Sequence, residues 1–414
     1  LVDQGLHPTT IMSGYHQAVE IATDTLSALA ETYDITNEPE CLRVAETVMS
    51  GTNLQAAPKA LAPLVVDAIT RVTDGYNVDL NALRVRTDRG RGIEASEFLP
   101  GAIIDAVPHK FENEAFGTSR ILFLSGSVEP TDLRTDFEVS IATDEALDSL
   151  KQVETDSATK IRKQLQDIGA EVVVADGVSD SVRRELTAAG IPTVTSLSDA
   201  DKRFLLRTLN MKSISDPLDA TRSDLVAADV RFNHDENYTV FTSPNAKTAT
   251  LHLYSTSEEQ SQELENVFDK AIEVVTHVAT DGRILPGGGA PEVAMAADIR
   301  EQTPTVPGRE QLAVYAFADA LETLPGLLAQ NAGLDRTDLV LALRSSHADN
   351  MDAGGIDVTA GEVANMWDKG VLDTFVTKKQ MLSNVEQAAE TLLRIDGMIQ
   401  EPEDEPQSRT GPTV

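Results

Sequence analysis

Apolar residues recur at three- and four-residue spacing over residues 8–33 and 41–75, a pattern that predicts amphipathic helices. From about residue 101 the pattern changes to short apolar runs separated by Pro, Gly and Asp, which predicts strands. Three such runs are AIIDAV (102–107), RILFLSG (120–126) and FEVSIA (137–142). Strand-like and helical runs then alternate beyond residue 169, which predicts an α/β layer.

Two longer helices are predicted from the same spacing. Residues 144–168 place six apolar side chains at helical intervals before Gly169, and residues 257–282 read as one long helix that ends at Gly282. From there to residue 400 the pattern is almost wholly helical, apart from two glycine-rich interruptions. The order of helices, α/β segment and helices suggests one helical domain whose two halves are separated by an insertion.

Length and charge narrow the functional classes. The chain has 414 residues, too many for one hydrophobic core, and its net charge is −33, from 67 acidic and 34 basic residues. Such a surface repels nucleic acid and anionic lipid, because both require cations to neutralise phosphate. Since the acidic residues are spread along the chain, they are more typical of a halophile surface than of a local binding patch.

The hydrophobic pattern indicates neither a secretory signal nor a membrane-spanning helix. No run approaches the roughly 18 apolar residues of a membrane helix, and residues 1–30 lack the pattern of a secretory signal. Cys41 is the only cysteine, which excludes an internal disulfide framework. We therefore expect a cytoplasmic protein, with a disordered polar tail at 402–414.

Three consecutive glycines, Gly287, Gly288 and Gly289, precede a helical pattern. Glycines there let a backbone approach a phosphate and present N–H groups and the positive helix end to it. A helix-entry turn is the alternative, because the run is neither a Walker loop nor a dinucleotide fingerprint. Asp357 and Asp373 each stand beside a glycine turn, where a carboxylate could hold ribose hydroxyls or simply form the turn.

Other kinds of chemical site find no support. The seven histidines show no ligand spacing, so we predict no metal site within this chain. A nucleophile elbow of the Gly-x-Ser-x-Gly type is also lacking.

The stretch from 283 to 397 resembles the C-terminal equatorial domain of group II chaperonins of the thermosome type. The segments that carry the resemblance are PGGGAPEVAMA, GREQLAVYAFADALETLP, LAQNAGLDRTDLVLALRSSH, GGIDVTAGEV, GVLDTFVTKKQ and ETLLRIDGMI, in the family's order and spacing. The opening LVDQGLHPTTIMSGYHQA is similar to the helix that follows the family's phosphate-binding segment. A thinner resemblance continues through 101–256, so that all but the tail is covered.

The resemblance implies a multidomain α and α/β chaperonin fold, with a helical equatorial domain split by an intermediate domain and an inserted α/β apical domain. The implied equatorial domain, incomplete here, is 1–36 plus 287–401. The intermediate domain is 37–100 plus 257–286. The apical domain is 101–256, with a helical lid segment near 144–168.

The resemblance also implies function. Gly287, Gly288 and Gly289 would approach ATP, Gly355 and Asp357 would line its base and sugar, and Asp373 would hold the ribose. The implied partners are unfolded proteins and identical or related subunits in a double ring, with no nucleic acid and no membrane. Mg²⁺ would bind with the help of the family's phosphate loop and G-D-G-T-T segment, which lie upstream of the opening helix and are not in this sequence.

A second departure concerns ATP hydrolysis. The family places an aspartate that activates the attacking water on the long helix before the triple glycine. Counting back from Gly287 puts Lys270 at that position and Asp269 one residue earlier, and one residue on a helix turns a side chain by about 100°. Another carboxylate or a shifted register could compensate.

Two hypotheses follow, with a third that has less support. The first is an ATP-dependent protein-folding subunit whose intact form is an ATPase, this chain alone being inactive. The second is a diverged ring subunit that binds nucleotide or partners with little hydrolysis, which Lys270 favours. The third, an unrelated enzyme with a glycine-rich phosphate loop, lacks an accompanying catalytic set.

Overall fold

The computed structural model describes residues 1–33, 38–50, 58–109, 111, 115–130 and 144–395. The strand predicted at 137–142 and the tail at 402–414 lie outside these residues. The chain forms two compact units, which we call unit 1 (Leu1–Gly51 with Glu273–Val414) and unit 2 (Thr52–Ile272). The two predicted helical halves therefore meet in one body, as the split-domain prediction requires.

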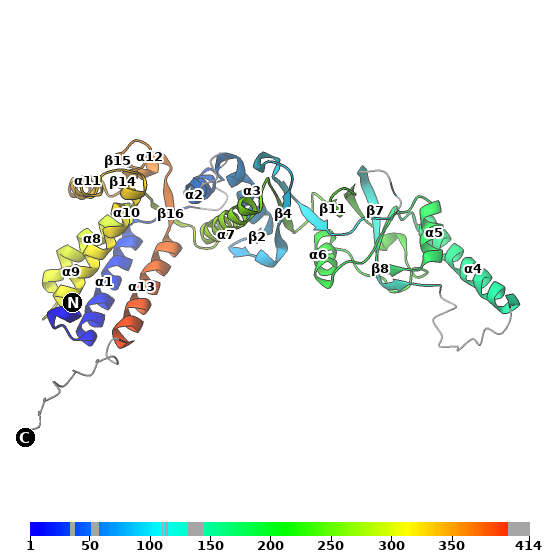
Figure 1. Cartoon of the computed structure of the whole chain (residues 1–414), viewed down its shortest axis with the longest axis horizontal. Helices are drawn as coiled ribbons and strands as arrows, with labels where there is room; N and C mark the ends of the chain where they lie inside the picture. Colours follow the sequence, from blue (N-terminus) through cyan, green and yellow to red (C-terminus); the bar gives the residue numbers. More distant parts are fainter. Residues whose placement is uncertain (34–37, 51–57, 110, 112–114, 131–143, 396–414) are drawn as a thin grey trace, which may run out of the picture. The chain divides into compact units, whose positions relative to one another are not determined.

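Unit 1 is built on four helices that pack along one another (Figure 1). They are α1 (Pro8–Leu29), α8 (Ala290–Gln302), α9 (Glu310–Leu321) and α13 (Phe375–Ile395). The apolar stripe of α1 faces this core, because its buried residues recur every three or four positions; they are Ile11, Gly14, Ala18, Ala22 and Leu26. Gly14 lets α1 approach α9 closely, because a Cβ there would lie 2.6 Å from the Cβ of Ala313.

Other helices and short strands complete unit 1. The helices are α2 (Glu38–Ser50), α10 (Thr323–Asn331), α11 (Arg336–Ala348) and α12 (Met366–Lys369). The strands are β1 (Glu31–Thr32), β13 (Arg283–Pro286), β14 (Gly354–Asp357), β15 (Glu362–Asn365) and β16 (Leu372–Thr374). Strands β1, β13 and β16 form an antiparallel sheet, and β14 pairs with β15. The sequence pattern after residue 283 did not indicate these strands, because runs of three or four residues are too short to show a period.

Unit 2 contains a six-stranded mixed sheet in the order β6-β11-β10-β7-β8-β9. Its strands are β6 (Gly101–Ile104), β7 (Ala115–Val128), β8 (Val172–Val178), β9 (Thr193–Val194), β10 (Val226–Asn233) and β11 (Tyr238–Thr242). Strands β7, β8 and β9 are parallel and the others antiparallel. The predicted α/β layer is thereby confirmed.

Helices cover both faces of this sheet. Ile121 and Phe123 of β7 pack with buried residues of α6 (Asp199–Leu209). Leu122 and Leu124 pack on the other side with residues of α4 (Asp144–Ile168) and α5 (Asp180–Ala188). Alternate residues of one strand thus enter two separate cores, as the two-residue period of a strand requires. The bounds of α4 match the helix predicted at 144–168.

The rest of unit 2 surrounds a smaller sheet in the order β4-β12-β5, with strands β4 (Leu83–Arg89), β5 (Glu97–Leu99) and β12 (Ala249–Ser255). A two-stranded ribbon joins β2 (Thr73–Asp74) to β3 (Asn77–Val78). Helix α3 (Pro58–Val72) packs on β12 and β5. Helix α7 (Glu258–Asp281) is the long helix predicted at 257–282, and it runs from unit 2 into unit 1.

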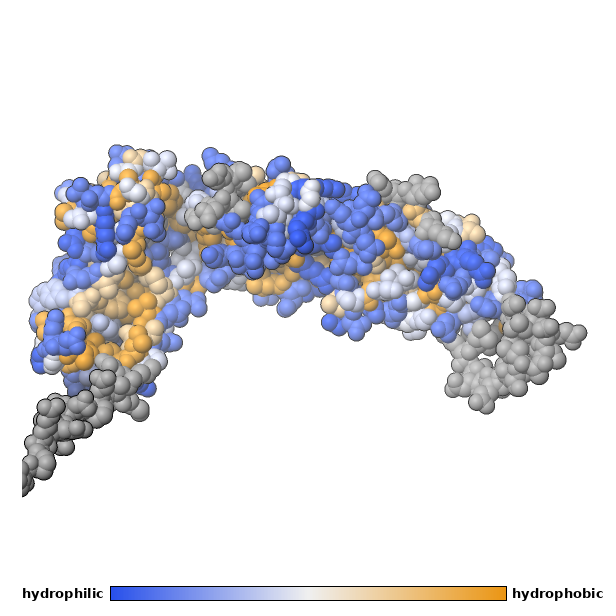
Figure 2. Space-filling model, viewed as in Figure 1, coloured by the Kyte–Doolittle hydropathy of each residue, from blue (hydrophilic) through white to orange (hydrophobic). Residues whose placement is uncertain are grey.

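Unit 1 exposes several large apolar side chains. They are Leu312 and Tyr315 of α9, Leu324, Leu327 and Leu328 of α10, and Leu341 of α11. Figure 2 shows hydrophobic residues gathered on the surface of the unit that contains α1 and α9. Contiguous apolar surface marks interaction sites for proteins, membranes or ligands.

Among the described residues, Glu310–Asn331, which contains α9 and α10, is long and apolar enough to cross a membrane by length and composition. Half of its most apolar 18-residue stretch is buried inside the structure, and the core helices of soluble proteins can have the same length and composition. The stretch is weak evidence for a membrane span.

Candidate functional site

The triple glycine forms the turn between β13 and α8 in unit 1. Gly288 and Gly289 have φ angles of +64° and +84°, which L side chains rarely adopt. At Gly288 a Cβ would also lie 2.7 Å from the Met366 sulfur and 2.9 Å from the Ile356 nitrogen. Both conformation and space therefore require glycine at this position.

The glycine turn lies against the second glycine-rich segment. The Ile356 amide donates to the Gly288 carbonyl over 2.8 Å, and the Gly287 amide donates to the Val371 carbonyl, also over 2.8 Å. A Cβ on Gly355 would lie 2.6 Å from the Gly287 carbonyl oxygen. The structure thus brings Gly355 against Gly287 and Gly288, although it lies 68 positions after Gly287 along the chain.

The turn before α8 contains backbone N–H groups that can donate hydrogen bonds to a ligand. Within the described residues, the backbone amides of Gly288 and Gly289 have no hydrogen-bond acceptor. They precede the first turn of a 13-residue helix, where the helix dipole favours negative charge. The turn can therefore receive an anionic group, and it equally satisfies the simpler requirement of a tight helix entry.

Asp357 is the last residue of β14, and its carboxylate already has partners within the chain. Oδ1 accepts hydrogen bonds from the Thr359 and Ala360 amides at 2.9 and 3.1 Å, and Oδ2 lies 2.8 Å from the Lys369 ammonium. The hydrogen bond from Lys369, aided by those amides, lowers the pKa of Asp357 below its ordinary value. Its contacts are those of a turn-forming residue, the alternative that the sequence left open.

Asp373 occupies β16, directly opposite Leu285 on the strand that leads into the triple glycine. Its Oδ2 lies 3.0 Å from the ammonium of Lys378, and a third of its side chain is exposed. Lys378 also lies 2.6 Å from Oε1 of Glu292, in the first turn of α8. Asp373 is thus held beside the glycine turn with part of its carboxylate open to solvent.

Sequence reasoning missed Glu292 and Lys378. A signal was present, because Phe375, Lys378 and Leu382 stand at helical spacing on α13, and the two apolar members are buried. A lysine within such a stripe needs a buried partner. Its partner, Glu292, is 86 residues away, a pairing that one sequence does not reveal.

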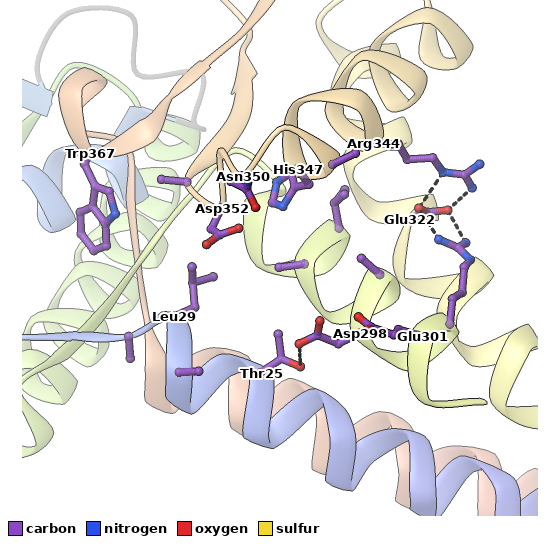
Figure 3. A pocket seen from close by; sticks show the side chains of 18 of the residues that line it. Thr25, Leu29, Asp298, Glu301, Glu322, Arg344, His347, Asn350, Asp352 and Trp367 are labelled. Carbon is purple, nitrogen blue, oxygen red and sulfur yellow. Dashed lines mark hydrogen bonds and ion pairs between the residues drawn. The ribbon is translucent and has the colours of Figure 1, made fainter. Parts of the chain in front are cut away.

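A groove of about 730 Å³ also opens in unit 1, beside α8 (Figure 3). Small side chains of α1, α8 and α11 form much of its lining, and Asp298 accepts a hydrogen bond from Thr25 over 2.8 Å. On one side Glu322 binds both Arg300 and Arg344. None of the six predicted nucleotide-binding residues lines this groove.

Lys270 and Asp269 are both exposed on α7, between the buried pair Val267 and Phe268 and the buried Ala271. They belong to unit 2, whereas the glycine turn belongs to unit 1. Their part in hydrolysis stays a prediction. Among the described residues, no group of three or more His, Cys, Asp and Glu side chains is arranged to hold a metal ion.

Comparison with known proteins identifies the family. The family model described as the TCP-1/cpn60 chaperonin family matches residues 1–403. A thermosome subunit of Methanopyrus kandleri is 33% identical over 96% of this chain and 75% of its own length. Thermosome subunit 2 of Haloferax volcanii is 36% identical over 96% of this chain and 73% of its own.

A solved structure agrees with these relatives. The open-state monomer of a group II chaperonin from Methanococcoides burtonii has a TM-score of 0.63 and 28% identity, and the match covers 95% of this chain and 94% of that one. The resemblance noted in the sequence is therefore confirmed along nearly the whole chain. The chain belongs to the TCP-1/cpn60 chaperonin family, as a subunit of the group II type.

Proposed function

We propose that this chain acts as an ATP-dependent protein-folding subunit of a double-ring chaperonin. The observation that carries the proposal is the family match over residues 1–403, together with the assembly of the glycine turn and Asp373 in one place. The curated relatives are described as thermosome subunits. Their function comes to this chain through that shared family.

In this proposal, the nucleotide site is in unit 1. The amides of Gly288 and Gly289 donate to phosphate oxygens at the positive end of α8, and Asp373 accepts hydroxyl groups of the ribose. Gly287 and Gly355 let the two backbone segments approach, and Asp357 shapes the loop after β14. Mg²⁺ would be held chiefly by the nucleotide's phosphates, with the help of the family's phosphate loop and G-D-G-T-T segment, which this sequence does not contain.

ATP supplies binding energy that favours one arrangement of domains, and its hydrolysis releases that arrangement. The proposed three-domain division assigns substrate binding to the apical part, 101–256, whose six-stranded sheet has two cores of its own. Helix α4 would belong to the lid. The exposed apolar residues of α9 and α10 support burial of this surface against other polypeptide in an assembly, and a cytoplasmic location accompanies such a role.

The experiment is an ATP-dependent refolding assay. The subunit, expressed from its complete reading frame at high salt, is mixed with a chemically denatured reporter enzyme. We expect ATP to increase the recovered reporter activity and Gly288→Val to abolish that increase. The control is Gly333→Val, where the glycine also has a positive φ but an added Cβ meets no atom within 4 Å. It distinguishes damage to the nucleotide site from backbone strain at a positive φ.

A second function rests on one residue. Lys270 is exposed on α7 where the family pattern expects a water-activating aspartate. A lysine is charged at neutral pH unless it is deeply buried, so it cannot accept the proton of the attacking water. A ring subunit that binds nucleotide with little hydrolysis is the function that this residue favours.

A further inference from the structure

A charged cluster joins three elements around the proposed sugar site. The ammonium of Lys378, in the first turn of α13, contacts Glu292 of α8 over 2.6 Å and Asp373 of β16 over 3.0 Å. The side chains of Lys378 and Glu292 are 16% and 2% exposed, whereas Asp373 is 33% exposed. The cluster is therefore closed at the Glu292 end and open at the Asp373 end.

Lys378 stays charged in this setting. Burial lowers the pKa of an ammonium, but attraction to Glu292 and Asp373 outweighs burial and raises the pKa of Lys378 above its ordinary value. Two carboxyl groups, those of Glu292 and Asp373, share this one ammonium. The buried oxygen Oε2 of Glu292 has no hydrogen-bond partner among the described residues.

Lys378 restricts the open carboxylate. Its ion pair with Oδ2 occupies one oxygen of Asp373 and fixes the orientation of the carboxylate, while Oδ1 accepts no hydrogen bond from the described residues. A carboxylate oxygen held in a fixed position suits hydroxyl donors such as a vicinal diol. Without the ammonium, the Asp373 side chain would be free to rotate on a short strand.

We propose that Lys378 is a positioning residue that orients Asp373 to accept the ribose hydroxyls of a nucleoside triphosphate. Through Glu292 it also ties the sugar-binding strand to the first turn after the triple glycine, so that the phosphate and sugar ends of the site are held by one ammonium. This inference rests on the proposed function of Asp373 as the ribose acceptor. It adds the residue that makes Asp373 selective for ribose hydroxyls.

The test measures sugar selectivity rather than affinity alone. Dissociation constants for ATP and for 2′,3′-dideoxy-ATP are determined by calorimetric titration for the subunit expressed from its complete reading frame. A lost hydrogen bond to a charged group weakens binding roughly tenfold to hundredfold. We expect the unmodified subunit to prefer ATP by that factor and Lys378→Met to reduce the ratio to near one.

Two further variants separate positioning from structural support. Lys378→Met strands the buried Glu292 charge, so the double variant Glu292→Gln with Lys378→Met restores an uncharged interior and the fold. We expect this double variant to melt near the unmodified protein while its sugar selectivity stays lost. The control is Lys379→Met, which removes an exposed lysine from the next position on α13 and should retain full selectivity.

The outcomes are distinct. If the folded double variant keeps the ATP preference, Lys378 only neutralises Glu292 and the inference is overturned. If the unmodified subunit binds ATP and the dideoxy analogue equally, Asp373 is not the ribose acceptor, and the proposed site fails together with this inference. If the unmodified subunit prefers ATP and Lys378→Met keeps that preference, the proposed site stands and only this inference is overturned.

Discussion

Glu322 offers the sharpest test of how unit 1 is held together. Its side chain is 5% exposed, and it accepts hydrogen bonds from Arg300 at 2.6 and 2.7 Å and from Arg344 at 2.8 Å. These bonds join α8, the segment between α9 and α10, and α11. Glu322→Gln keeps the shape but removes the charge that both guanidinium groups share.

The pKa shift of Glu322 gives the size of the expected loss of stability. Burial alone would raise the pKa of Glu322, but the bonds from Arg300 and Arg344 lower it from 4.5 to about 2. A shift of that size corresponds to roughly 3 kcal/mol. Because 47% of the Arg344 side chain is exposed, solvent screens part of this energy. We expect Glu322→Gln to lower the free energy of unfolding by about 2 kcal/mol and Tm by roughly 4–8 °C.

The same shift sets a pH window. Since the pKa of folded Glu322 lies below its unfolded value, the stabilisation is complete above about pH 5 and is lost as pH falls toward 2. The difference in Tm between the unmodified protein and Glu322→Gln should therefore shrink over that range. Calorimetric or circular dichroism melts at several pH values measure this difference.

The matched control is Glu390→Gln, which breaks the exposed ion pair between Glu390 and Arg394 on α13. Exposed pairs of this spacing contribute about 0.5 kcal/mol or less. Equal melting temperatures for Glu322→Gln and the unmodified protein at pH 7, in low and high salt, would refute the reasoning.

Three further predictions concern the site and the domains. Lys270→Asp should raise the rate of phosphate release, up to the roughly 10²–10⁴-fold that a positioned general base contributes; unchanged rates in Lys270→Asp and in Asp269→Asn would contradict the alignment of α7. Gly288→Ala should destabilise unit 1 by more than the roughly 1 kcal/mol expected for Gly333→Ala, since a Cβ meets atoms only at the former; equal melts would show that the turn relaxes. The isolated segment 101–256 should melt cooperatively at high salt, because both of its sheet faces are covered; a broad, non-cooperative transition would count against an independent domain.

Periodicity predicted the long elements correctly. The stripe of α1, the bounds of α4 and, to within one residue at each end, those of α7 appear in the structure where the spacing of apolar residues placed them, and the strand predicted at 120–126 lies within β7. These elements are long enough for a period to emerge. The joining of the two helical halves was also predicted from their order.

The remainder could not be found from local pattern. Strands β13 to β16 each have three or four residues, and their identity comes from hydrogen bonds to partners far along the chain. The partnership of Glu292 with Lys378 likewise depends on the tertiary fold. For Asp357, either sequence interpretation was possible until the backbone amides of Thr359 and Ala360 were placed beside it.

As proposed above, this chaperonin-family subunit uses ATP to fold other proteins. The most direct measurement is the yield of active reporter enzyme, diluted from denaturant into the assembled subunit at high salt, with ATP and with no nucleotide. We expect a higher yield with ATP, and a loss of this gain in Gly288→Val but not in Gly333→Val. Equal yields with and without ATP, from an assembly shown by native mass spectrometry to be intact and by calorimetry to bind ATP, would contradict it.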